Sequence, residues 1–161
     1  MNNPNQIAVK NVLDGWRGRV LEANKILSQI SDEQMMNEIV PGRNRGIYLL
    51  GHLVAETDRM LPILNFEKLN YPALAAPFIL NPDKTIAELP SVAELRENWV
   101  VINEILTKHI NTLSAEDWFE RHTSISAEDF VKEPHRNKLS IMVSRASHLA
   151  YHVGQLSFLR G

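Results

Sequence analysis

The feature that most constrains the fold is the spacing of apolar side chains, which recur at every third or fourth residue in four long stretches. This period belongs to one face of an amphipathic α-helix, whereas a half-buried strand would alternate at every second residue. The four stretches cover roughly residues 5–30, 45–65, 91–113 and 138–159. Because helices of this kind bury their apolar faces against one another, we predict an all-α chain that folds as a four-helix bundle.

Residues at the ends of these stretches carry signals that start helices. Ser31 and Gln34 have capping-box spacing, so a short helical turn is expected after the first helix. Ser91 and Glu94 have the same spacing at the start of the third helix, and Asn137 is a candidate N-cap for the fourth.

The segment 66–90 contains four prolines and shows no helical period. A connection of this length is unusual inside a compact domain. A helix of about 20 residues is roughly 30 Å long, so this connection can travel the length of a bundle and allow the next helix to run parallel to the previous one. The polar segment 118–137 fits either a short hairpin or a turn of helix.

Length and charge limit the class of protein. A chain of 161 residues suits a single domain, residues 1–161, because two domains would each have too small a core. Lys and Arg number 17 against 19 Asp and Glu, which gives a formal charge of −2. This balance argues against a nucleic-acid partner.

Cysteine is absent from the chain. The protein itself therefore has no disulfide framework, zinc-thiolate site or nucleophilic thiol, and its composition is compatible with a reducing cytoplasm. No apolar run approaches the roughly 20 residues of a membrane span. The first residues lack the basic start and apolar run of a signal peptide. We therefore expect a cytoplasmic protein with no membrane partner.

Two histidines in the last helical stretch, His148 and His152, are four residues apart. Residues four apart lie on the same face of a helix, with about 5 to 6 Å between their Cβ atoms. Two imidazoles at that separation can bind one ion through nitrogens about 2.0 to 2.1 Å from it. Leu149 and Val153 flank the pair, which indicates a position near the apolar face.

His52 lies in a similar apolar setting in the second helical stretch. Gly51 beside it allows another element to approach closely. Three histidines on two inward faces are consistent with a three-histidine metal site that has open coordination positions. They are also consistent with three core or boundary histidines that are hydrogen-bonded to their neighbours. The residues alone leave both interpretations open.

Two segments resemble motifs of a known family. Ile47–Leu53, which reads IYLLGHL, is similar to the histidine motif in the second helix of the DinB/YfiT-like metalloenzymes, and His148–Leu156, which reads HLAYHVGQL, is similar to their C-terminal HxxxHxGQ signature. The resemblance covers nearly the whole chain, including the break after the first helix at 27–34.

This resemblance implies a fold and a ligand set. The fold is a four-helix bundle in the order up-down-down-up, with the long connection between helices two and three. The ligands are three histidines that hold a divalent transition metal, carried over here to His52, His148 and His152.

The resemblance also implies a function, because characterised relatives transfer low-molecular-weight thiols or isomerise thiol adducts, and many are dimers. We therefore expect a metal-dependent enzyme that acts on a small molecule by thiol-dependent transferase-type or detoxification chemistry, and that forms a homodimer. The alternatives are a metal-dependent hydrolase, or a non-catalytic dimeric bundle with a structural or incidental metal.

Three neutral imidazoles would leave the full charge of a divalent ion uncompensated, which favours a thiolate or hydroxide in the open positions. Ligation by histidine alone suits zinc, nickel, iron or copper and does not select among them.

Glu56 lies one helical turn after His52 and shares its face. It is a candidate fourth ligand, an acceptor that orients an imidazole, or a general base. The other interpretation is an exposed glutamate paired with Arg59.

His109 tests the topology, because it falls near the end of the third helix. If the long connection makes that helix parallel to the second, His109 lies on the order of 25 Å from His52. We favour this arrangement, in which His109 has no role in the site. His122 and His135 fall in a polar connector and are expected to be solvated.

The aromatic residues are expected to serve packing. We predict that the three tryptophans are core or interface anchors, and that two tyrosines near the histidines are half-buried packing residues, although their hydroxyls could also point into a pocket. These residues are Trp16, Trp99, Trp118, Tyr48 and Tyr151.

Overall fold

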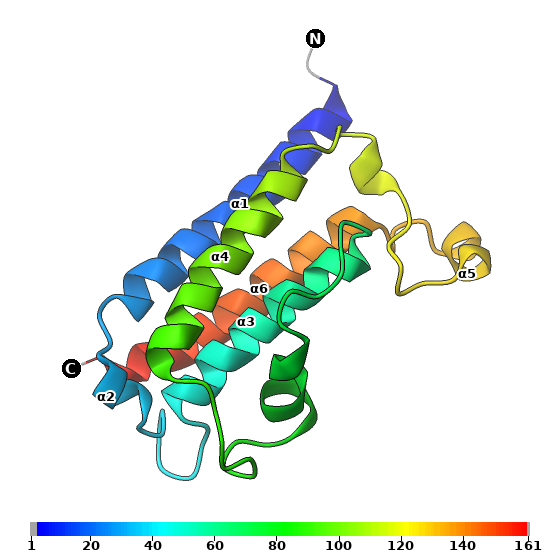
Figure 1. Cartoon of the computed structure of the whole chain (residues 1–161). Coiled ribbons are helices and arrows are strands. Elements are labelled where there is room, and N and C mark those ends of the chain that lie inside the picture. The colour runs from blue at the N-terminus through cyan, green and yellow to red at the C-terminus, as the bar shows by residue number, and fades with distance from the viewer. Residues whose placement is uncertain (1–2, 161) are drawn as a thin grey trace.

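The structure is a computed structural model that describes residues 3–160, so the first two residues and the last residue of the predicted domain 1–161 lie outside the described residues. Within this range the chain is helical and contains no β-strand. Four long helices lie side by side (Figure 1). They are α1 (Pro4–Leu27), α3 (Gly46–Ile63), α4 (Val92–Ile110) and α6 (Lys138–Leu156). The prediction of an all-α fold is confirmed.

Shorter elements connect the long helices. They are α2 (Asp32–Met35), the 3₁₀ turn η1 (Pro72–Leu74), the single π-helical turn η2 (Ala76–Leu80), the 3₁₀ turn η3 (Asp117–Phe119), α5 (Ala127–Lys132) and the 3₁₀ turn η4 (Ser157–Leu159). The segment 118–137, whose pattern fitted either a hairpin or a helical turn, therefore contains the helix α5.

The predicted helix starts are correct because each depends on a local hydrogen bond. The Ser31 hydroxyl accepts from the Gln34 N–H at 3.1 Å, while the Gln34 side chain accepts from the Ser31 N–H at 2.7 Å. At α4 the Ser91 side chain accepts from the Glu94 N–H, and at α6 the Asn137 side chain accepts from the Ser140 N–H, which caps both helices without the reciprocal bond. The long helices end two to three residues earlier than the apolar period predicts. The last apolar residues of each predicted stretch lie in the turn that follows the helix.

The core lies between two helix pairs. α1 packs against α6 and α3 packs against α4, while α3 also contacts α6. Trp16 of α1, Trp99 of α4 and Trp118 of η3 are almost fully buried, which confirms that the tryptophans are core anchors.

The connection 66–90 carries the chain back along α3. At the end of α3, the ring of Phe66 stacks on His109 near the end of α4, with 4.8 Å between ring centroids. Asp83, late in the connection, binds Arg45 at the start of α3. Arg96 in the first part of α4 donates to the Ile30 carbonyl beyond the end of α1.

None of the helices within residues 3–160 combines the length and the apolar character that crossing a lipid bilayer requires.

Candidate metal centre

The three histidines predicted as ligands meet at one point between α3 and α6. The Nε2 atom of His148 lies 3.2 Å from Nε2 of His52 and 3.1 Å from Nε2 of His152. One nitrogen from each ring lies within 4.8 Å of the other two, so the triad is close enough to bind a metal ion. All three side chains are half-buried.

The other ring nitrogens of two of these histidines are already hydrogen-bonded. Nδ1 of His52 donates to the backbone carbonyl of Phe78 at 2.7 Å. Nδ1 of His152 donates to the side-chain carbonyl oxygen of Gln155, also at 2.7 Å. Because a carbonyl oxygen can only accept, the proton of the neutral imidazole is on Nδ1 in each case, and its Nε2 presents a lone pair.

With these tautomers, too few protons lie between the three Nε2 atoms for every short contact to be a hydrogen bond. His148 can place at most one proton on its Nε2, and that proton can be directed at only one of the two facing nitrogens. At least one of the two short contacts therefore brings lone pairs together. A cation between the three nitrogens would remove this repulsion. Two nitrogens bound to one tetrahedral ion at about 2.0 to 2.1 Å lie about 3.3 Å apart, close to the spacing observed. The residues fit a divalent transition metal.

The electrostatics of the site favour the neutral, metal-binding form of His148 and His152. Burial lowers the pKa of His148 to about 4, with further contributions from His152 and His52. Burial also lowers the pKa of His152, although its hydrogen bond to Gln155 acts in the opposite direction. A histidine with a lowered pKa is unprotonated at neutral pH and needs to release no proton before it binds a metal.

Gly51 explains how a backbone carbonyl reaches His52. A Cβ atom at Gly51 would lie only 2.4 to 2.6 Å from three ring atoms of Phe78, which is fully buried. The absence of a side chain therefore lets η2 pack directly on α3. The sequence expectation that another element approaches closely here is confirmed.

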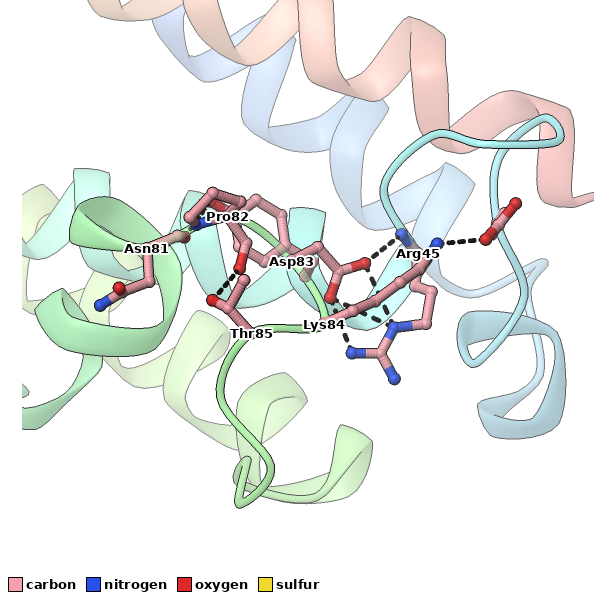
Figure 2. A network of polar contacts seen from close by, with 8 residues as sticks. Arg45, Asn81, Pro82, Asp83, Lys84 and Thr85 are labelled. Atoms are coloured by element: carbon pink, nitrogen blue, oxygen red, sulfur yellow. Dashed lines mark hydrogen bonds and ion pairs between the residues drawn. The ribbon is translucent and has the colours of Figure 1, made fainter.

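The connection that supplies this carbonyl is fixed to α3 at two further points (Figure 2). The carboxylate of Asp83 accepts from the Arg45 N–H at 2.8 Å and from its guanidinium at 2.7 Å. Burial would raise the pKa of Asp83, but the bonds from Arg45 outweigh it and hold the pKa below the usual range. The hydroxyl of Tyr48 donates to the Asn81 carbonyl at 3.0 Å. Segment 78–83 is thus positioned as a support for His52.

Glu56 lies close to the triad but is occupied by two arginines. Its carboxylate forms an ion pair with Arg59 of its own helix at 2.8 Å and another with Arg145 of α6. Burial acts to raise the pKa of Glu56, but Arg145 and then Arg59 outweigh it, so the pKa lies below the usual range. The predicted pairing with Arg59 is confirmed, whereas the predicted exposure is wrong, because Glu56 is buried. The convergent group of ligand atoms consists of the histidines and does not include Glu56.

Two tyrosines adjoin the triad with different exposure. The half-buried ring of Tyr48 is parallel to that of His52, with 6.3 Å between centroids, as expected for a packing residue. Tyr151 is exposed rather than half-buried, and its hydroxyl accepts from the Gln155 amide at 3.2 Å.

The remaining histidines lie outside the triad. Nε2 of His109 is 3.3 Å from a carboxylate oxygen of Glu67, at the end of α4, as expected for a residue with no role in the site. His135 is exposed, as predicted. The prediction that His122 is solvated is wrong. It is 5 % exposed and its Nδ1 accepts from the Ser124 N–H, and burial lowers its pKa.

A cavity of about 570 Å³ opens beside His152. Its walls come from the loop before α3 and from the last turns of α6 with η4. The lining residues are Ile39, Val40, Arg43, Asn44, Tyr151, His152, Gln155 and Phe158. This volume is in the range of small-molecule sites, about 300 to 1,000 Å³.

Sequence reasoning assigned no supporting role to three groups that hold the triad in place. Gln155 lies three residues after His152, so helical spacing was a usable signal. Phe78 acts through its backbone carbonyl, which no side-chain pattern reveals. Arg145 is 89 positions from Glu56, and only the fold brings them together.

No protein-family model and no curated protein sequence matches the chain.

Proposed function

We propose that the chain is a DinB-like metal-dependent enzyme that acts on a small molecule. In this proposal His52, His148 and His152 hold one divalent transition metal, which is zinc, nickel or iron. The cavity beside His152 receives the substrate, and the first reaction class to test is the transfer of a low-molecular-weight thiol.

One observation supports the proposed metal site most strongly. In the neutral imidazoles of His52 and His152 the Nε2 atom has no proton, and both Nε2 atoms face that of His148 at 3.1 to 3.2 Å. Histidines that serve only packing would avoid such an arrangement, since it leaves lone pairs facing one another in a half-buried site. The bonds from Nδ1 to Phe78 and Gln155 are of the kind that orients metal-binding imidazoles.

The family assignment includes the up-down-down-up order of the four long helices. Contacts at the helix ends support this part of the proposal. Phe66 and His109 join the ends of α3 and α4. Arg17 of α1 bonds to Asn111 just after α4 at 3.1 Å, while Arg96 reaches the other end of α1. These contacts fit a parallel α3–α4 pair and an antiparallel α1–α4 pair.

A divalent ion held by three neutral imidazoles favours the deprotonated form of a thiol bound beside it, and a thiolate is the nucleophile in conjugation. The residues of the chain supply the rest. Phe78 and Gln155 fix two imidazole rings, and Arg145 neutralises the nearby carboxylate of Glu56. The cavity beside His152 provides a partly enclosed space for the second substrate.

A thiol-transfer assay tests the enzyme. Metal-loaded protein is mixed with a low-molecular-weight thiol and chlorodinitrobenzene, so that a carbon–sulfur bond forms, chloride leaves and the thiol proton passes to buffer. We expect a rate above the uncatalysed background in the parent protein and in a His135→Ala control, which removes an exposed histidine outside the triad. We expect the rate to fall to background in His52→Ala.

Two results would favour the alternatives. Hydrolysis of an activated ester that depends on the triad, with no thiol transfer, would indicate a metal-dependent hydrolase. Stoichiometric metal without either activity would indicate a bundle with a structural metal.

A further inference from the structure

We propose that the substrate cavity beside His152 selects a small carboxylate with an apolar body, and that Arg43 binds the carboxylate. This inference rests on the proposed function, because it places the other end of the ligand at the metal held by the triad. It adds the chemical class of the ligand and the residue that recognises it.

The charge of Arg43 is the first observation. It lies in the loop before α3, in the wall of the cavity that also contains His152. Within residues 3–160, the neighbouring cations are paired, Arg45 with Asp83 and Lys84 with Glu38, whereas Arg43 forms no ion pair. A guanidinium that is left unpaired in a cavity wall is suited to an anionic ligand, and its planar fork matches a carboxylate.

A second donor lies beside it. Asn44 also lines the cavity, and among the described residues its side-chain amide forms no hydrogen bond. Its backbone carbonyl, by contrast, accepts from the Ile39 N–H at 3.0 Å. Two residues next to each other in the chain therefore offer unused side-chain donors at this cavity.

Part of the cavity wall is apolar. Val40, Tyr151 and Phe158 line the cavity and are 42 %, 63 % and 70 % exposed, so together they give it an apolar surface that a ligand can cover. Ile39 contributes a further apolar surface and is half-buried. A ligand with an apolar body would cover these side chains and remove them from water, which is favourable. A strongly hydrated ligand would not.

A second cavity does not present this chemistry. It has a volume of about 640 Å³ and lies between α2, the connection before α4 and the start of α4. Its charged residues are already paired, Asp32 with Arg96, Arg45 with Asp83, and Lys84 with Glu38. The cavity beside His152 therefore differs from this one, because its cation, Arg43, forms no ion pair with another described residue.

A binding experiment tests the inference without an activity assay. The protein is loaded with cobalt(II), whose absorption changes when a thiolate binds, and is titrated with ω-mercaptoalkanoates of increasing chain length. Each is compared with the ω-mercaptoalcohol of equal length, which has the same thiol and apolar chain but no carboxylate. At one chain length we expect the mercaptoalkanoate to bind about three- to tenfold more tightly than the mercaptoalcohol. This ratio is what a partly exposed ion pair contributes.

Variants of Arg43 assign the preference to this residue. Arg43→Gln should bind the two compounds equally, and Arg43→Lys should retain part of the preference. Arg136→Gln, which removes an exposed arginine of the connector before α6, should leave the preference unchanged.

The outcomes separate the two proposals. If cobalt binds and both compounds bind with equal affinity at every chain length, or if Arg43→Gln keeps the preference, the carboxylate inference is wrong and the metal site remains. If cobalt does not bind to the parent protein, the proposed function fails and this inference fails with it.

Discussion

Gly51 offers the sharpest test of how the fold positions the triad. In the variant Gly51→Ala, the new Cβ would lie 2.4 to 2.6 Å from the ring of Phe78, whereas ordinary contacts are 3.4 to 4 Å. Phe78 is fully buried, so the ring and η2 have to move by about 1 Å. Overpacking of this kind costs about 1 to 3 kcal/mol. Alanine also gains about 0.5 to 1 kcal/mol over glycine inside a helix.

A matched control isolates the packing cost. Gly18 lies within α1, and a Cβ there would meet no other atom within 4 Å. Gly18→Ala should therefore gain the helix propensity alone, about 0.5 to 1 kcal/mol. We expect Gly51→Ala to be less stable than Gly18→Ala by about 1 to 3 kcal/mol, as measured by equilibrium unfolding in urea.

The displacement should also reach the metal. Since the Phe78 carbonyl moves with η2, the bond from Nδ1 of His52 is weakened, and the affinity for zinc should fall about tenfold, as measured by competition with a chelating dye. Gly18→Ala should bind zinc like the parent. The reasoning is refuted if Gly51→Ala matches Gly18→Ala in both stability and zinc affinity.

Three further predictions concern the connection, the histidines and the assembly. Asp83→Asn should lower the free energy of unfolding, measured in a urea titration, by about 2 kcal/mol. The reason is that the Asp83 side chain is only 3 % exposed and Arg45 loses its charged partner. An unchanged urea midpoint would contradict this. The free energy of unfolding of the metal-free protein should fall by about 1 kcal/mol as the pH is lowered from about 6.5 to about 4. In this range the unfolded chain binds a proton at His148, whereas the folded chain, in which the pKa of His148 is about 4, does not. The urea midpoint should shift less over this range in His148→Gln. Sedimentation equilibrium should give twice the chain mass of 18.3 kDa, as expected for a homodimer, and a single-chain mass at all concentrations would contradict the dimer.

Most of the fold was predictable because its determinants are local. Helical periodicity predicts the four long helices, and the caps at Ser31, Ser91 and Asn137 each depend on residues within one turn of the chain. The pair His148 and His152 follows from the same helical spacing.

The parts that were not predictable depend on long-range contacts. The burial of Glu56 results from Arg145 on another helix, and an isolated helix sequence gives no reason to expect it. The hydrogen bond to the Phe78 carbonyl involves a backbone group in an irregular connection, for which Gly51 was only an indirect sign. His122 lies in a polar segment that the fold nevertheless covers.

The most direct test of the central claim is the metal content of untagged protein by elemental analysis. The parent protein should contain about one equivalent of a transition metal, and so should His109→Ala, which removes a histidine at the end of α4. The double variant His148→Ala, His152→Ala should remain folded and contain none. The account is contradicted if the parent binds no stoichiometric metal after reconstitution with zinc, nickel, iron and manganese, or if the double variant keeps its metal.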